Sequence, residues 1–396
     1  MIYLDNNATT RIAPEVFAAM QPYLTEVYGN PSSAHSLGRQ MKSAVERARE
    51  QVAELVGAAQ TREIVFTSCG SESDNWAIGG FLEQNPTRRH IITTRVEHEA
   101  VRNLCEHLAQ IGCEVTWLDV DERGELKLDD LRQALRRDTG LVSVMLANNE
   151  TGVLFPIAEI GKIIREHSDA VFHVDGVQAV GKIPINLKEL DVDLFALSGH
   201  KLHAPQGVGV LYVRDGVKLP PFIIGGHQEN GRRGGTSAVP NIVGLGAACE
   251  LASNFDGHST IETLRNKLET SIIRRIPNAR VNGTTEAAKR LPNTSNISFE
   301  YVEGENILVH LDQAGICVST GSACHSTTKQ SSPTLRAMNV PYTAAQGSIR
   351  FSLGRYNTEA EIDQTLEVLP EIIDKLVEMS PYDEQLKALY AVRSKA

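Results

Sequence analysis

The sequence predicts an α/β fold in which a mainly parallel β-sheet lies between helices, followed by a smaller α+β domain. The first observation is an alternation of short apolar runs and helical patterns between residues 63 and 174. Such alternation is typical of parallel strands joined by helices on both faces of a sheet. The second is that the chain after about residue 257 changes to an α+β pattern. The third is that 396 residues, 41% of them hydrophobic, suffice for a large core and two or three domains.

The segment before the alternation is expected to hold one extended stretch and two helices. Residues 1–12 are crowded with Asp, Asn and Thr, which suits a loop near a polar site. A helix is expected over residues 14–28, interrupted near Pro22. Residues 28–38 are rich in Gly, Asn, Pro and Ser and predict a loop, and the next helix stops at Gly57.

The alternating part predicts five strands, each a short apolar run: residues 63–67, 90–96, 113–120, 141–147 and 170–174. Helices are expected between them, after residue 70, before Gly112, and over residues 128–137 and 156–167. Two further apolar runs, residues 194–197 and 208–213, predict neighbouring buried strands.

The connection between these last two strands carries Lys201, with His200 and His203 close by. A lysine that acts as an amine nucleophile needs a partly desolvated place near other cationic groups, so that its free base is accessible. The alternative is an ordinary surface lysine in a hairpin.

The domain boundary is expected near Asp256–Gly257. A Gly-rich linker without strands covers residues 222–239, and helices follow over residues 240–254 and 260–276. We therefore expect a large domain of residues 15–257 and a small domain made of residues 1–14 and 258–396. The small domain is expected to hold four strands, near residues 280–282, 296–300, 316–319 and 348–353. Its last long helix begins with the capping box Thr358–Glu361.

Composition excludes several classes of protein. A net charge of −10 argues against general nucleic-acid binding. No apolar run approaches the roughly 18 residues that span a bilayer, and the N-terminus lacks the pattern of a secretory signal. The six scattered cysteines form no C-x-x-C pair and are expected to be free thiols in a reducing cytoplasm.

Polar residues follow the predicted strands, at the edge where open α/β sheets bind ligands. Gly70 and Ser71 open a helix whose free N–H groups suit a phosphate, although many helix starts look the same. His98 could stack on an aromatic ring and exchange protons at neutral pH, although a lone histidine is more often structural.

Asp175 ends its strand and could cap a helix, bind a metal or pair with a protonated ring nitrogen, and no metal-like spacing supports the second option. Gln178 can point to the same side if a helical turn follows. The pair Asn148–Asn149 forms a turn or offers amides to a phenolic oxygen or a carboxylate. With Lys201, these residues supply the parts that a pyridoxal phosphate site requires.

Cys324 lies in a Ser/Thr-rich stretch without an apolar pattern, which predicts an exposed loop. Its neighbour His325 could favour the thiolate, and the alternative is an incidental surface thiol. Arg350 lies in a predicted strand and could form a fork on a substrate carboxylate. The alternative is a surface ion pair, with Arg355 as a competing candidate.

Long motifs occur in order along essentially the whole chain: YLDNNATT, FTSCGSESDN, HVDGVQAVGK, SGHKLHAPQGVG, GGHQENGRRGGT, STGSAC and RFSLGRYNTEAEID. The chain that carries them resembles cysteine desulfurases, in the class V aminotransferase superfamily of fold-type I pyridoxal phosphate enzymes. The resemblance implies a sheet of the seven-stranded type in the large domain. Two departures are Glu99, where Pro or Lys often follows the histidine, and Gly176, where Ala usually follows the aspartate.

By this resemblance, Lys201 binds the cofactor covalently and moves protons at the substrate carbon. Asp175 would pair with the pyridine nitrogen, Gln178 would contact the phenolic oxygen, and His98 would stack on the ring. The phosphate would be held by a set that includes one residue from the other subunit of a homodimer: Gly70, Ser71, Ser198, His200 and, from that subunit, Thr236. The substrate would be held by Asn149, which also lies at the cofactor, by Arg350 and by Asn30.

The resemblance also implies the reaction. L-Cysteine would give L-alanine, with its sulfur captured as a persulfide on Cys324 and passed to an iron–sulfur scaffold or another acceptor protein. A transient [2Fe-2S] cluster could be shared with the scaffold through Cys324. The motifs look most like the nitrogenase-type desulfurase. The alternatives are a housekeeping desulfurase for iron–sulfur clusters and tRNA thiolation, a selenocysteine lyase, and a non-enzymatic scaffold.

Overall fold

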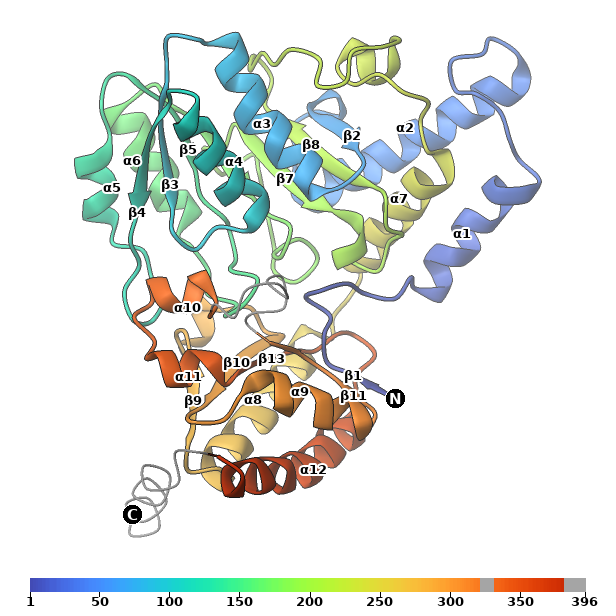
Figure 1. Cartoon of the computed structure of the whole chain (residues 1–396). Coiled ribbons are helices and arrows are strands. Elements are labelled where there is room, and N and C mark those ends of the chain that lie inside the picture. Colours follow the sequence, from blue (N-terminus) through green and yellow to red (C-terminus); the bar gives the residue numbers. More distant parts are fainter. Residues whose placement is uncertain (321–330, 381–396) are drawn as a thin grey trace.

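The computed structural model describes residues 1–320 and 331–380. Its largest sheet has seven strands in the order β2-β8-β7-β6-β5-β3-β4 (Figure 1). Their bounds are β2 Ile64–Thr67, β3 His90–Thr94, β4 Glu114–Leu118, β5 Thr139–Ser143, β6 Val171–Asp175, β7 Leu194–Ser198 and β8 Gly209–Val213. Only β8 is antiparallel to its neighbours in this sheet. This arrangement confirms the mainly parallel, seven-stranded fold class.

Helices cover both faces of this sheet, because successive apolar side chains along its strands point to opposite faces. In β7, Leu194 packs in a core with Trp76 of α3, whereas Phe195 packs in the core that includes α2, α6 and α7. Figure 1 shows α3 and α4 crossing in front of the sheet. The helices of this part are α1 Pro14–Thr25, α2 Ser36–Val56, α3 Gly70–Gln84, α4 Glu99–Gln110, α5 Leu128–Ala134, α6 Ile157–His167 and α7 Val239–Ser253.

The interruption expected at Pro22 is absent, because α1 continues through this proline to Thr25. A proline inside a helix deprives the carbonyl four residues earlier of its partner. That residue, Ala18, is exposed, so water can replace the lost hydrogen bond. The Gly-rich linker is strandless as expected and holds a short 3₁₀ turn at Gln228–Gly231.

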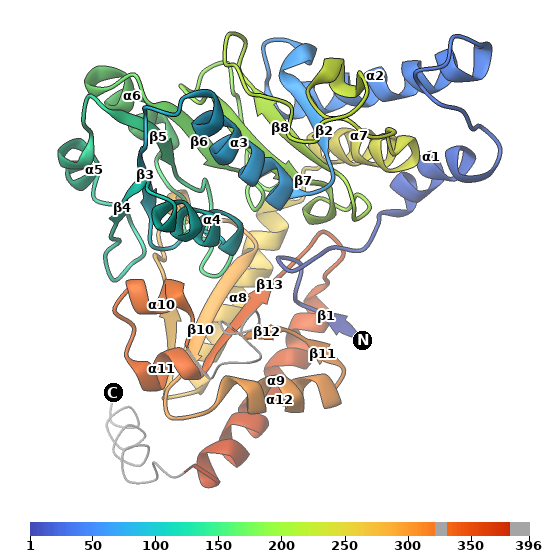
Figure 2. The same ribbon diagram turned by 45° about the horizontal axis from the view of Figure 1, so that its top comes forward.

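The C-terminal part forms a second, antiparallel sheet with the order β12-β13-β10-β9 (Figure 2). The strand expected over residues 316–319 is two strands in different sheets, because β11 Ile316–Cys317 pairs with β1 Ile2–Tyr3, whereas β12 Ser319–Thr320 pairs with β13. The remaining bounds are β9 Ala279–Asn282, β10 Thr294–Phe299, β13 Ser348–Ser352, α8 His258–Arg275, α9 Gly304–Gln313, α10 Pro333–Ala337, α11 Tyr342–Gln346 and α12 Glu359–Glu378.

Separate hydrophobic cores support the proposed division into two domains. One core packs the second sheet against α8, α9 and α12, and it includes Ile2 and Leu4 from the N-terminus. The cores of the large sheet lie apart from it, although one of them also takes in Leu335 of α10 and Met338. The short helices α10 and α11 therefore lie at the junction of the two parts (Figure 2). No described helix is both long and apolar enough to cross a membrane.

Candidate active site

A cavity of about 180 Å³ lies at the carboxyl ends of the parallel strands. Nine of the residues predicted for the site line it together: Gly70, Ser71, His98, Asn149, Asp175, Gln178, Ser198, His200 and Lys201. They come from the segments after β2, β3, β5, β6 and β7, which are far apart in the sequence. Because parallel strands end at one edge of a sheet, these segments meet there.

Lys201 lies in a one-turn 3₁₀ helix, Gly199–Lys201, between the buried strands β7 and β8, as predicted. Its Nζ donates hydrogen bonds to the backbone carbonyls of Asn7, at 2.5 Å, and Ala8, at 2.8 Å. The amine is therefore held at the cavity by neutral acceptors. The neighbouring His200 ring lies 3.1 Å from Thr9 Oγ1 through its Nδ1, and burial, aided by Lys201, lowers the pKa of His200 to about 4.

Asp175 is the last residue of β6 and is buried. Within the described residues, the only hydrogen bond to its carboxylate comes from the backbone N–H of Val177, at 2.9 Å. Burial raises the pKa of Asp175, and the nearby His98 and Lys201 oppose this rise. A buried carboxylate with so little compensation is poised for a cationic partner in the cavity.

His98 is the N-cap of α4, and its Nδ1 accepts a hydrogen bond from the backbone N–H of Ala100 at 3.1 Å. This bond leaves Nε2 as the nitrogen that carries the proton of the neutral ring. Burial lowers the pKa of His98, which favours that neutral form.

The opposite end of the cavity suits an anion. The fifteen-residue helix α3 begins at Gly70, so its first free N–H groups face this end, beside Ser198 and His200. A Cβ on Gly70 would lie 2.7 Å from Val177 Cγ2, so only glycine allows the close approach of the helix to the β6 loop.

The cavity thus offers an anion cradle at one end, a lysine amine, and a buried carboxylate without a cationic hydrogen-bond partner among the described residues. Pyridoxal phosphate requires this set of groups: donors for its phosphate, an amine for its aldehyde and an anion for its pyridinium nitrogen. The residues present therefore fit this cofactor. The roles of the individual residues stay predictions.

The presence of glycine at position 176 has a steric reason in this chain. A Cβ at this position would lie 1.9 Å from Cζ of the buried Phe195 ring of β7. The bulky Phe195 and the missing side chain at residue 176 therefore form one packing unit directly after Asp175.

Arg350 and Asn30 do not line this cavity. Arg350 is only 8% exposed and donates to the carbonyl of Asn149 at 3.0 Å and to Asp5 Oδ1 at 2.7 Å. It therefore forms a buried ion pair, and its Nε has no hydrogen-bond partner among the residues that the structure describes. Asn30 is exposed, and its Oδ1 accepts a hydrogen bond from the backbone N–H of Ser32.

Thr236 is exposed and lines a different cavity, together with Ser68 and Arg233. Its expected action from the other subunit stays a prediction. Cys324, with its expected persulfide and cluster-binding roles, lies outside the described residues.

Two residues near Lys201, one buried and one half-buried, were not recognised as candidates from the sequence, although both lie in quoted motifs. Asn7 accepts a hydrogen bond from Lys201 through its backbone carbonyl. Lys182 donates hydrogen bonds to Asn7 Oδ1 at 3.0 Å and to Gln178 Oε1 at 2.9 Å. The polar crowding of residues 1–12 was the available signal for Asn7, and nothing local distinguished Lys182.

Two further acidic groups lie buried near Asp175, and one of them, Asp74, lines the same cavity. Burial raises the pKa of Glu97 to about 8, and burial together with the charge of Asp175 raises the pKa of Asp74. Asp74 Oδ1 lies 3.4 Å from His173 Nε2, and neither atom has a hydrogen-bond partner within residues 1–320 and 331–380. Among the described residues, no group of three His, Cys, Asp or Glu side chains is placed to hold a metal ion.

Comparison with known proteins identifies relatives over nearly the whole length. The model of the class V aminotransferase family matches residues 2–365. A cysteine desulfurase of Trichormus azollae is 56% identical over 384 residues, which cover 96% of this chain and 95% of the relative. The cysteine desulfurase NifS of Azotobacter vinelandii is 51% identical, with coverage of 96% and 94%. A solved NifS-like protein has a TM-score of 0.89 at 40% identity, and the match covers 95% of this chain and 100% of that structure.

Proposed function

Since the chain belongs to the class V aminotransferase family and, within it, to the cysteine desulfurases, we propose that it converts L-cysteine to L-alanine with pyridoxal phosphate as its cofactor. The observation that carries this proposal is the cavity in which Lys201, Asp175 and the N-terminus of α3 meet. Lys201 would hold the cofactor's aldehyde carbon, Asp175 its pyridinium nitrogen, and Gly70, Ser71, Ser198 and His200 its phosphate. When bound, the cofactor supplies an electron sink for negative charge that develops at the substrate's α-carbon.

Lys201 is the group that moves the substrate's protons. The carbonyls of Asn7 and Ala8 accept its N–H groups and hold its Nζ at the cavity. Held there, Nζ is placed to take the proton from the α-carbon. Loss of that proton weakens the bond between the β-carbon and sulfur.

Cys324 is proposed to complete the reaction. Its thiolate attacks the substrate sulfur, so that a sulfur–sulfur bond forms as the carbon–sulfur bond breaks. The electron pair of the broken bond stays with the β-carbon, which takes up a proton, and Lys201 returns the first proton to the α-carbon. The amino acid then leaves as L-alanine. The product on the protein is a Cys324 persulfide, and the sulfur then passes to an acceptor.

Arg350 and Asn149 are proposed to hold the substrate carboxylate, with Asn30 as an additional contact. The Asn149 side chain lines the cavity, and Arg350 donates to the carbonyl of the same residue. The guanidinium already bonds Asp5, so substrate binding must share or replace that bond.

We infer that the acceptor is an iron–sulfur scaffold that serves nitrogenase, which the relative from Azotobacter vinelandii supports. A housekeeping role, including tRNA thiolation, and selenocysteine cleavage are the alternatives. The same proposal includes a homodimer in which Thr236 contacts the phosphate of the cofactor bound to the other subunit. It also includes a transient [2Fe-2S] cluster at Cys324. Deleting the gene would then lower nitrogenase activity while other iron–sulfur enzymes keep theirs.

The activity is tested by measuring alanine formation from L-cysteine. Lys201→Ala is expected to abolish it, because the variant has no amine to hold the cofactor or to move the proton. Cys324→Ala is expected to keep the visible absorbance of the bound cofactor and to lose persulfide and sulfide formation. The matched control is Cys317→Ala, which removes another thiol that is not fully buried and does not line the cavity.

Unchanged sulfide release by Cys324→Ala would remove that cysteine from the mechanism and favour a lyase that needs no protein thiol. Full cluster assembly by Lys201→Ala would instead favour a non-enzymatic scaffold.

A further inference from the structure

Lys182 is a second lysine at the site, four residues after Gln178. Its Nζ donates one hydrogen bond to Gln178 Oε1, at 2.9 Å, and one to Asn7 Oδ1, at 3.0 Å. Burial lowers the pKa of Lys182 well below its ordinary value, and the positive charges of Lys201 and Arg350 act in the same direction. A neutral amine has two N–H groups, and the two acceptors use both of them.

Gln178 is held at both ends of its amide. Its Oε1 accepts the hydrogen bond from Lys182, and its Nε2 donates to the backbone carbonyl of Asn7 at 3.0 Å. A backbone carbonyl can only accept, so the nitrogen must lie at that end. The second N–H of the amide can donate to a group bound in the cavity of about 180 Å³, which Gln178 lines.

Asn7 connects this arrangement to Lys201, since its carbonyl accepts from both Gln178 and Lys201. Its side chain is 1% exposed and is fixed by Lys182 and Asn293 at the oxygen and by Thr294 at the nitrogen. The position of Gln178 relative to Lys201 is therefore set by buried hydrogen bonds rather than by a surface loop.

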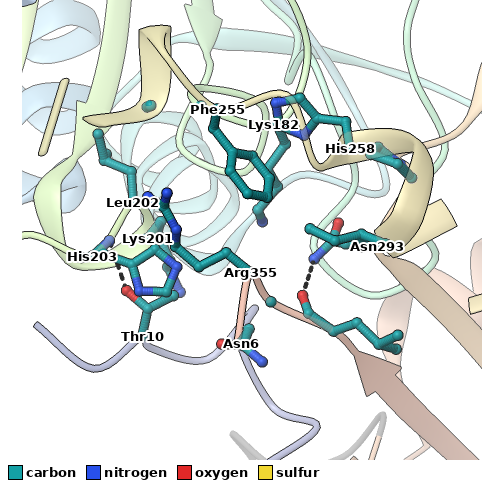
Figure 3. Close-up of a pocket in the computed structure, with 16 residues that line it drawn as sticks. Asn6, Thr10, Lys182, Lys201, Leu202, His203, Phe255, His258, Asn293 and Arg355 are labelled. Carbon is teal, nitrogen blue, oxygen red and sulfur yellow. Dashed lines mark hydrogen bonds between the residues drawn. The ribbon is translucent and has the colours of Figure 1, made fainter. Parts of the chain in front are cut away.

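A second cavity, of about 50 Å³, shares Lys201 with the first and has Lys182 on its wall (Figure 3). Among the described residues, the titratable groups that line it besides the two lysines are His203, His258 and Arg355, and none of the lining residues carries a carboxylate. Burial lowers the pKa of His203 to about 4. On the described part of this wall, Lys182 thus faces neutral or cationic groups, and no negative charge there favours its ammonium form.

We propose that Lys182 is a positioning residue that holds Gln178 against the phenolic oxygen of the cofactor and thereby sets the proton affinity at the bond between Lys201 and the cofactor. The inference rests on the proposed cofactor roles of Gln178 and Lys201. The N–H of Gln178 draws charge from the phenolic oxygen, which weakens the attraction of that oxygen for the neighbouring proton. When Lys182 is lost, the buried Oε1 of Gln178 has no partner, and the amide turns away to find one.

The test is the pH titration of the visible absorption band of the bound cofactor in the full holoenzyme. Gln178→Leu is expected to raise the midpoint by roughly half to one pH unit, because the hydrogen bond to the phenolic oxygen is gone. Lys182→Met is expected to raise it in the same direction. The double variant is expected to match Gln178→Leu alone, since Lys182 acts through Gln178.

The matched control is Lys188→Met, at an exposed lysine outside both cavities, which should keep the wild-type midpoint. Should Lys182→Met not fold, Lys182→Gln serves instead, since its shorter amide cannot span both acceptors and a partial rise is expected. An unchanged midpoint in the Lys182 variants would overturn the inference. So would shifts that add in the double variant, because Lys182 would then act by its charge. Failure of the wild type to develop any visible band would instead contradict the proposed function itself.

Discussion

The groups around Lys201 come from two regions that are built in different ways. Asp175, Gln178 and Ser198 stand at or just after the ends of strands in the large sheet. Asn7 and Arg350 come from the N-terminal segment and the small sheet, and they reach the site through hydrogen bonds between residues more than 140 positions apart. In the proposed function, the first region would supply groups for the cofactor, and the second would set the positions of those groups and of the substrate. A change in the first should therefore alter chemistry, and a change in the second should alter geometry and stability.

The largest effect is expected at Asp175. Asp175→Asn keeps the shape of the side chain but removes the anion, so turnover should fall by roughly 10²-fold or more. Asp74→Asn is the matched comparison at a neighbouring buried carboxyl, whose raised pKa favours its neutral form already, and the loss should be much smaller. Steady-state alanine formation measures both. Equal losses would mean that the two carboxyls share the task.

The junction of the two regions should respond in stability. Asp5→Asn leaves the buried guanidinium of Arg350 without its counter-charge and is expected to lower the free energy of unfolding by about 2 kcal/mol. The control is Asp215→Asn, which breaks the exposed Arg62–Asp215 pair and should leave stability close to that of the wild type. Denaturant unfolding distinguishes them, and a stable Asp5→Asn protein would argue that the ion pair has no structural role.

The packing unit after Asp175 can be tested by restoring the residue that is usual in the family. Gly176→Ala places a methyl group against Phe195 and should destabilise the protein by about 1 to 3 kcal/mol. Gly176→Ala combined with Phe195→Leu should recover part of that loss, because the smaller side chain makes room. Thermal unfolding measures both variants. A tolerated Gly176→Ala with Phe195 intact would contradict this packing.

The smallest expected effect is on the pH dependence of the free energy of unfolding. The pKa of Glu97 is about 8 in the folded chain and near 4.5 when unfolded, so the folded state binds the extra proton. Stability from this group is present below about pH 4.5 and is lost as the pH rises toward 8, by up to about 1.4 kcal/mol per pH unit. His173, with its pKa lowered to about 3 by burial, acts oppositely and only below its unfolded value of 6.5.

Glu97→Gln should therefore weaken the decline in stability between pH 6.5 and 8 in the cofactor-free protein. Glu83→Gln, at an exposed glutamate of α3, should leave the decline as it is. An identical pH dependence in Glu97→Gln would show that other buried carboxyls account for the slope.

The same contrast explains how much of the fold and of the site could be predicted from the sequence. The parallel sheet and the positions of Lys201 and Asp175 followed from local patterns, because a strand end carries its own polar residue with it. Three other features depend on what surrounds each segment in the folded chain, which a local pattern does not show. They are the continuous helix at Pro22, the division of residues 316–320 between two sheets, and the Arg350–Asp5 pair. Lys182 is the clearest case, since only the folded chain brings its amine between Gln178 and Asn7.

The most direct test is to reduce the cofactor-loaded protein with borohydride and to locate the modified residue by peptide mass spectrometry. Lys201 and Lys182 line the same small cavity, so the experiment chooses between two neighbouring amines. We predict that the cofactor is fixed to Lys201 and that Lys182 stays unmodified. Modification of Lys182 or of any other lysine, or the absence of bound cofactor, would contradict the account.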